Sequence, residues 1–278
     1  MRMGKQAFLD SPSKRVTLLG MSGVGKTRLA NILRNESWFH YSVDYRIGTR
    51  YVGEAILDNI KTQAMQVPFL RELLLSDSIY IANNITFNNL KPLSTFLGKL
   101  GNPDEQGLSL VEFKRRQALH LDAELNAMKD VPGFIAKANS VYGYDNFLND
   151  ASGSFCEIDD KQVIGDIAKH TLMVYIEADK ADEKMLIERA AREPKPLYYR
   201  ESFLDEHLAL YMQKNRFEYI AQIAPDDFVR WVFPKLFRSR VPRYQAIAQE
   251  YGYTIAARDA FAITSANEFL ELVGSTLE

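Results

Sequence analysis

The run from residue 20 to residue 27, Gly-Met-Ser-Gly-Val-Gly-Lys-Thr, constrains the fold more than any other feature of the sequence. It has the required residue at every fixed position of the phosphate-loop (Walker A) pattern. The apolar segment Val16–Leu19 before it is typical of a buried strand, and Thr27–Arg34 after it has apolar residues at helical spacing. The motif therefore stands between a predicted strand and a predicted helix, the context in which such a loop binds nucleotide phosphates.

Each part of the motif has its own chemical reason. The glycines permit backbone conformations that a side chain would obstruct, so that loop N–H groups can point at phosphate oxygens. Lys26 can reach the β and γ phosphates, and the Thr27 hydroxyl can bind Mg²⁺. The start of the following helix adds its positive end. We therefore predict ATP and Mg²⁺ as cofactors, with the nucleotide held by Gly20, Ser22, Gly23, Val24, Gly25, Lys26, Thr27 and Arg28.

Composition limits the partners that the chain can attract. It has 278 residues, with 34 Lys and Arg against 36 Asp and Glu, a formal charge of −2. This balance argues against attraction to nucleic acid or to an anionic membrane. The single cysteine, Cys156, excludes an intramolecular disulfide, and no apolar run is long enough to cross a membrane. With no signal peptide evident in Met1–Lys14, we expect a cytoplasmic protein.

Strand-like and helix-like segments alternate along most of the chain. We predict further strands at 38–43, 143–149, 172–176 and 253–257, and helices at 109–128, 157–169, 181–192, 201–223, 244–251 and 266–273. This alternation is typical of a three-layer α/β P-loop fold with a mostly parallel five-stranded sheet. Residues 53–75 have a helical pattern, and glycine, proline and asparagine crowd 76–107. We therefore predict a nucleotide-binding core from 1–52 and 109–278, and a helical insertion at 53–108 that serves the substrate or a partner.

Four later segments carry short motifs: Asp44-Tyr45-Arg46, Ser152-Gly153-Ser154, Lys195-Pro196-Leu197-Tyr198 and Arg240-Val241-Pro242-Arg243-Tyr244. In this order, after the phosphate loop, they resemble the shikimate kinase family of small P-loop kinases. That family has an Asp-x-Asp pair, a glycine-rich turn, an Arg-Pro-Leu-Leu lid sequence and an Arg-x-Pro-x-Tyr sequence. Two positions depart from it, because Arg46 replaces the second Asp and Lys195 replaces the lid arginine.

The resemblance implies roles for the matching residues. It places Asp44 near Mg²⁺ and the reacting hydroxyl, and it places Gly153 and Arg240 at the acceptor, with Arg240 on a carboxylate. It also implies that Lys195 acts from a mobile lid at about 188–202, and that Arg189 stacks on adenine. The replaced Asp argues against shikimate itself as the acceptor.

A carboxylate is expected to share the Mg²⁺ with Thr27. Asp150, which follows a rather polar predicted strand, is one choice, and Asp44 is another. Glu177 or Asp179 are alternatives to Asp150, because they follow the more apolar strand at 172–176. Asp44 is also compatible with a turn or helix-cap role. We predict a metal site formed by Thr27, Asp44 and Asp150.

Two functions of different classes fit these features. The first is a Mg²⁺-dependent kinase that moves the ATP γ-phosphoryl to a small anionic acceptor, with Lys26, Asp44 and Lys195 as catalytic residues. Arg46, Arg50 and Arg240 suggest the anionic acceptor, since guanidinium groups present only hydrogen-bond donors. The second is an ATPase or nucleotide switch that acts on a protein partner through the insertion. The sequence leaves the oligomeric state open.

Overall fold

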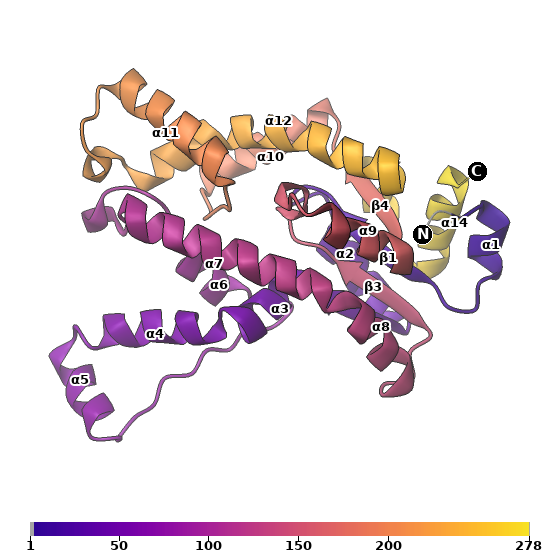
Figure 1. The fold of residues 1–278 in the computed structure, drawn as a ribbon, viewed down its shortest axis with the longest axis horizontal. Helices are drawn as coiled ribbons and strands as arrows, with labels where there is room; N and C mark the ends of the chain where they lie inside the picture. The colour runs from indigo at the N-terminus through magenta and orange to yellow at the C-terminus, as the bar shows by residue number, and fades with distance from the viewer. Residues whose placement is uncertain (1–2, 278) are drawn as a thin grey trace. The chain divides into compact units, whose positions relative to one another are not determined.

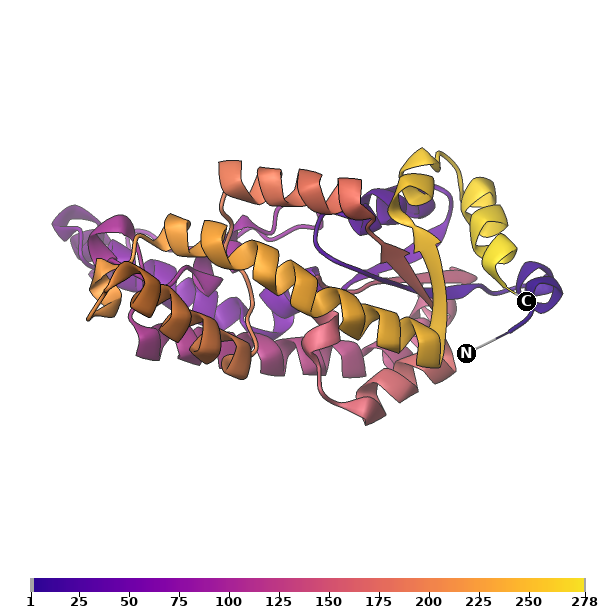
Figure 2. The same cartoon turned by 90° about the horizontal axis from the view of Figure 1, so that it is seen from above.

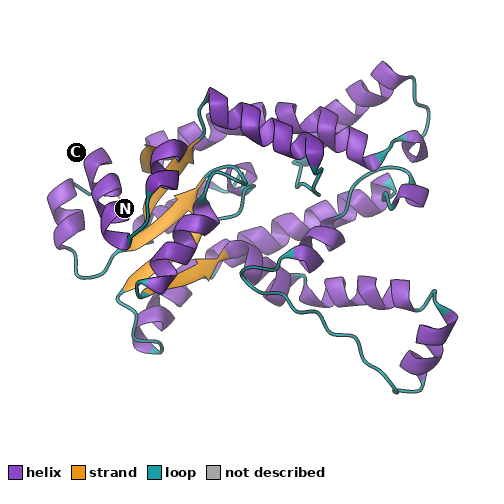
Figure 3. Ribbon diagram, turned by 180° about the vertical axis from the view of Figure 1, so that it is seen from behind, coloured by secondary structure: helices purple, strands orange, loops and turns teal. Residues whose placement is uncertain are grey.

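The computed structural model describes residues 3–277, and the chain divides into two compact units. The first unit comprises Met1–Val43, Glu124–Pro194 and Val229–Glu278, and the second comprises Asp44–Ala123 and Lys195–Phe228. The strands all belong to the first unit, whereas the second consists of helices and loops (Figure 3). The second unit contains the segment 53–108 and extends beyond it on both sides.

A five-stranded parallel sheet forms the centre of the first unit. Its strands lie in the order β2-β3-β1-β4-β5, and every neighbouring pair is parallel. Their bounds are β1 (Arg15–Leu19), β2 (Trp38–Ser42), β3 (Asn146–Asp150), β4 (Leu172–Glu177) and β5 (Gly252–Ala256). The predicted α/β P-loop fold with a five-stranded sheet is therefore confirmed.

Helices cover both faces of this sheet (Figure 1). On one face α2 (Lys26–Asn35) packs on β2 and β3 and contacts α13 (Ala257–Ala262), which also contacts β4 and β5. On the other, α8 (Val131–Ser140) packs on β2 and β3 and contacts α9 (Lys161–His170) beneath β4. Right-handed crossovers require this division, because the chain moves in opposite directions across the sheet after β1 and after β2.

The first and last described helices lie at the side of the sheet, next to its last strand. Helix α14 (Ala266–Thr276) packs on β5 and lies beside α1 (Lys5–Asp10) (Figures 1 and 2). Helix α12 (Pro225–Tyr251) leads directly into β5 (Figure 2), and α10 (Lys180–Arg192) follows β4.

The second unit is built from α4 (Gly53–Ala64), α5 (Pro68–Leu75), α6 (Lys91–Leu97), most of α7 (Leu110–Lys129) and α11 (Glu201–Asn215). A buried arginine of α7 connects three of these helices. Arg116 donates to the Phe96 carbonyl in α6, to Asn59 of α4 at 2.8 Å and to Glu112 of its own helix at 2.7 Å. Its charge is buried but paired, as buried charges are in stable folds.

Helix α12 differs most from the sequence-based expectation. Residues 244–251 do not form a separate short helix but end a helix of 27 residues that contains Pro234 and Pro242. A proline lacks the N–H of its helical hydrogen bond, so the sequence favours a break at each one. Leu236 and Tyr244 are fully buried, and this packing offsets the lost bonds. The predicted helix at 201–223 ends early, at Asn215, because Arg216 adopts the left-handed conformation.

A buried polar cluster joins the three central strands. The hydroxyls of Thr17 and Thr171 lie 2.7 Å apart, and the Asn149 amide donates to Thr17 at 3.1 Å. All three residues are fully buried, so water cannot replace a hydrogen bond that is lost from the cluster. Removing the Thr17 hydroxyl leaves the Asn149 amide without this acceptor, while Thr171 still donates to the Ile167 carbonyl at 3.0 Å.

We predict that Thr17→Val lowers the free energy of unfolding by about 1–3 kcal/mol, the cost of unsatisfied buried polar groups. The matched variant Thr17→Ser keeps the hydroxyl and loses only a methyl group. Denaturant unfolding of both variants and the wild type measures the difference. A Thr17→Val protein as stable as the wild type would contradict a structural role for the cluster.

Candidate nucleotide-binding site

The phosphate loop leaves β1 at its carboxyl end and enters α2, which begins at Lys26. Gly20 has φ +140°, and a Cβ there would lie 2.8 Å from the Ile176 carbonyl oxygen of β4. Gly25, the residue before α2, has φ +103°. L-residues with side chains rarely adopt such angles, so the turn depends on glycine at these positions.

The Lys26 side chain is folded over the loop. Its Nζ donates to the Gly20 carbonyl at 2.6 Å and to the Met21 carbonyl at 3.1 Å, and the residue is only 6% exposed. The ammonium group is therefore held at the loop by backbone oxygens. A phosphate placed in the loop would meet a cation that is already positioned.

Thr27 and Asp150 are joined across the loop. The Thr27 hydroxyl donates to Asp150 Oδ2 at 3.1 Å, and His40 Nε2 lies 3.6 Å from the same oxygen. Asp150 ends β3, and its pairing with Leu18 places it at the carboxyl end of β1, beside the phosphate loop. A hydroxyl and a carboxylate are both oxygen ligands that suit Mg²⁺.

This pair suits a magnesium ion whose other ligands come from water and from nucleotide phosphates. Within residues 3–277, no group of three or more His, Cys, Asp or Glu residues is arranged to hold a metal. Mg²⁺ usually binds one or two carboxylates and takes its other ligands from water and nucleotide phosphates. Thr27 and Asp150 thus suit Mg²⁺ that arrives with a nucleotide.

The two alternative acids are engaged elsewhere in the first unit. Glu177 accepts a hydrogen bond from Gln245 at 2.7 Å. Asp179 caps α10 by accepting from the backbone N–H groups of Ala181 and Asp182, and these bonds lower the pKa of its carboxyl. Of these three acids of the first unit, Asp150 is the one hydrogen-bonded to Thr27.

Two arginines flank the loop. Arg28 donates to the Ala260 carbonyl of α13 at 3.4 Å. Arg189 of α10 lies beside the loop at Gly23, since its Nη1 would be 3.3 Å from a Cβ on that residue. This location is compatible with a phosphate contact, and the adenine-stacking role implied by the resemblance stays a prediction.

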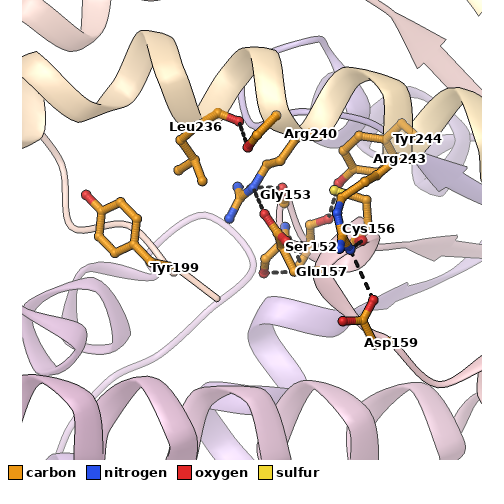
Figure 4. A network of polar contacts seen from close by, with 12 residues as sticks. Ser152, Gly153, Cys156, Glu157, Asp159, Tyr199, Leu236, Arg240, Arg243 and Tyr244 are labelled. Atoms are coloured by element: carbon orange, nitrogen blue, oxygen red, sulfur yellow. Dashed lines mark hydrogen bonds and ion pairs between the residues drawn. The ribbon is translucent and has the colours of Figure 1, made fainter. Parts of the chain in front are cut away.

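The segment after β3 is fixed by buried side chains (Figure 4). Arg240 of α12 donates from Nε to Glu157 Oε1 at 2.9 Å and from Nη1 to the Gly153 carbonyl at 3.0 Å. Arg240 and Glu157 are each 4% exposed. The guanidinium expected at an acceptor carboxylate is therefore engaged with a carboxylate of the protein itself. Nothing in the sequence around Glu157 indicates this pairing.

Other contacts hold the same segment. Ser152 and Ser154 donate to the buried Glu124, Ser154 at 2.8 Å. Arg243 donates to the Cys156 carbonyl at 3.0 Å and to Asp159 at 3.1 Å (Figure 4). Sequence analysis missed Glu124 entirely, because its apolar-faced helix gives no sign that one acid is buried.

The other predicted site residues belong to the second unit. Asp44 lies in the first turn of α3 (Val43–Arg46), directly after β2. The Arg46 guanidinium lies 5.6 Å from the centroid of the Tyr51 ring, while Arg50 and Lys195 are exposed. The roles of Asp44, Arg46, Arg50 and Lys195 toward a nucleotide or acceptor stay predictions.

Part of the expected lid is anchored within the second unit. The Gln117 side chain of α7 accepts from the Tyr199 N–H at 2.8 Å and donates to the Leu197 carbonyl at 3.3 Å. Tyr198 and Tyr199 are buried. Residues 193–196 connect the end of α10 to the anchored segment 197–199.

No protein-family model matches the sequence, and no curated protein matches it. Among solved structures, a shikimate kinase from Bacteroides thetaiotaomicron is similar to this chain. The match covers 94% of each chain with 15% sequence identity and a TM-score of 0.42. The phosphate loop and the parallel strand order of this chain define the class: a P-loop α/β protein.

None of the helices within residues 3–277 has the length and hydrophobicity needed to span a membrane.

We predict that the Cys156 thiol is unreactive in the native protein at pH 8. It is 2% exposed, and burial raises its pKa to about 12, so little of the reactive thiolate is present. Reaction with Ellman's reagent, followed by absorbance, should be very slow until guanidinium unfolds the chain, and should then release one equivalent. Rapid reaction of the native protein would show that the segment after β3 opens readily.

Proposed function

We propose that this chain binds ATP with Mg²⁺ and transfers its γ-phosphoryl group to a small anionic acceptor. The observation that carries the proposal is the hydrogen bond between Thr27 and Asp150 at the mouth of a complete phosphate loop. It places a hydroxyl and a carboxylate together beside a buried, positioned ammonium group. Phosphoryl transfer relies mainly on such positioning and charge stabilisation.

Each residue has a part in this proposal. The backbone N–H groups of the loop bind the phosphates, and Lys26, already held at the loop, pairs with the β and γ phosphates. Thr27 and Asp150 would hold Mg²⁺, which supplies charge neutralisation at the phosphates. Asp44 orients the acceptor hydroxyl, and Arg189 and Lys195 help to exclude water.

The proposed acceptor is anionic because Arg46 stands after β2 in the place of a family acid, with Arg50 nearby in the sequence. A guanidinium group offers donors in a fork that matches a carboxylate or phosphate. Arg240 gives no support to an anionic acceptor, because its guanidinium pairs with Glu157. The acceptor part of the proposal therefore depends on the arginines after β2.

We predict that Lys26→Ala weakens MgATP binding at least about tenfold, since a hydrogen bond to a charged group contributes roughly 1.5–3 kcal/mol. Asp150→Asn should weaken ATP binding more in the presence of Mg²⁺ than in its absence, because the metal ion loses a negatively charged ligand. Isothermal titration calorimetry measures both. The control is Lys61→Ala, an exposed lysine of α4 outside the loop, which should bind as the wild type does.

Unchanged affinity in Lys26→Ala, with the wild type binding normally, would contradict the assignment of the phosphate loop.

A second candidate is an ATPase or nucleotide switch that acts on a protein partner. The observation that favours it is α5, which has no buried residues although it carries Phe69 and Leu75, 68% and 72% exposed. Nearby Tyr80 is 88% exposed. Large exposed apolar side chains of this kind often mark interaction surfaces.

One experiment separates the two candidates. ADP production is measured with the protein alone and with a panel of small hydroxy-carboxylates and sugar phosphates. We expect an acceptor to stimulate turnover, and Arg46→Ala to raise the KM for that acceptor while the affinity for MgATP stays the same. Turnover unaffected by every acceptor but lost in Lys26→Ala would favour the ATPase.

A further inference from the structure

The buried ion pair between Arg240 and Glu157 is connected to the phosphate loop by Gly153, which contacts both. Arg240 Nη1 donates to the carbonyl of Gly153 at 3.0 Å. The other side of Gly153 faces Ser22, because a Cβ on Gly153 would lie 3.0 Å from the Ser22 nitrogen and 3.1 Å from its Cβ. Gly153 is thus held between a guanidinium group and the backbone of the phosphate loop (Figure 4 shows the guanidinium side).

The Ser22 backbone packs directly against Gly153 and leaves no room there for a side chain. A Cβ on Gly153 would lie closer to Ser22 than nine in ten real Cβ contacts, so a methyl group would have to displace Ser22 by a few tenths of an ångström. The N–H of Ser22 belongs to the set that would surround the phosphates. The position of Gly153 therefore limits where the Ser22 backbone can lie.

The ion pair is suited to hold Gly153 in one place. Both side chains are almost fully buried, so neither exchanges its partner for water. Breaking one half of a buried pair leaves an uncompensated charge, which is strongly unfavourable. The guanidinium is planar and donates in fixed directions, which defines the position of the Gly153 carbonyl relative to Glu157.

We propose that Arg240 is a positioning residue for the phosphate loop, acting through Gly153, and that it does not bind the acceptor. The proposal rests on the nucleotide binding proposed above. It restricts the acceptor site as well, because the acceptor's anionic group must then be bound by cations other than Arg240. It also gives Glu157 a function, which is to hold Arg240 against Gly153.

Three variants test this proposal. Arg240→Lys keeps the charge beside Glu157 but loses the planar fork that reaches Gly153. The double variant Arg240→Met with Glu157→Met removes both charges of the pair, so neither charge is left buried without the other. The control is Arg238→Met on the same helix, since the exposed Arg238 pairs with Glu183 at 2.8 Å, away from Glu157 and Gly153.

The first measurement is the affinity for MgATP by calorimetry at a temperature where circular dichroism shows each variant folded. We expect Arg240→Lys and the double variant to bind about tenfold or more weakly, the usual cost of removing a supporting contact behind a binding residue. Arg238→Met should bind within about twofold of the wild type, and hydrogen exchange at 20–27 should be faster only in the Arg240 variants.

A second measurement distinguishes positioning from acceptor binding. If Arg240 bound the acceptor, its variants would raise the acceptor KM and leave the affinity for MgATP unchanged, and that result would overturn the proposal. Full recovery of MgATP affinity in the double variant would also overturn it, because the ion pair would then serve stability alone. A wild-type protein that binds no MgATP would refute the proposed function and this inference together.

Discussion

The parallel pairing of β1 with β3 is the constraint on which the candidate site depends. Leu18 pairs with Asp150, so the end of β3 lies where the chain leaves β1 for the phosphate loop. Because β1 also pairs with β4, its backbone is bonded on both sides and gives the loop a rigid base. A shift of one residue in this register would turn Asp150 away from Thr27.

The charged groups around the loop are held in the interior by partners rather than by solvent. Lys26 donates to loop carbonyls, Arg240 pairs with Glu157, and Glu124 accepts from two serines. Buried charges need such partners, and partners with fixed geometry restrict the side chains that carry them. The result is a site whose polar groups are already positioned before a ligand arrives, which lowers the cost of binding.

Local patterns predicted the strands well and the longest helix badly. The apolar runs at 16–19 and 172–176 define β1 and β4 within a residue, because a buried strand in a parallel sheet needs apolar residues on both faces. Pro234 and Pro242 suggested breaks within α12, since a local pattern does not show the packing that offsets a missing N–H. The helix α8, at 131–140, was missed for a similar reason, as Pro132 and Gly133 weaken its local signal.

The sequence by itself determined the phosphate loop, its strand and helix, and the α/β class, because these depend on residue types at fixed short spacings. It also named Asp150 as one of several possible metal-side acids. Only the tertiary structure brought Asp150 to 3.1 Å from Thr27, and only it revealed that Arg240 pairs with Glu157. These partners are separated by 123 and 83 residues in the chain. Contacts over such distances are created by strand order and helix packing, which no local pattern encodes.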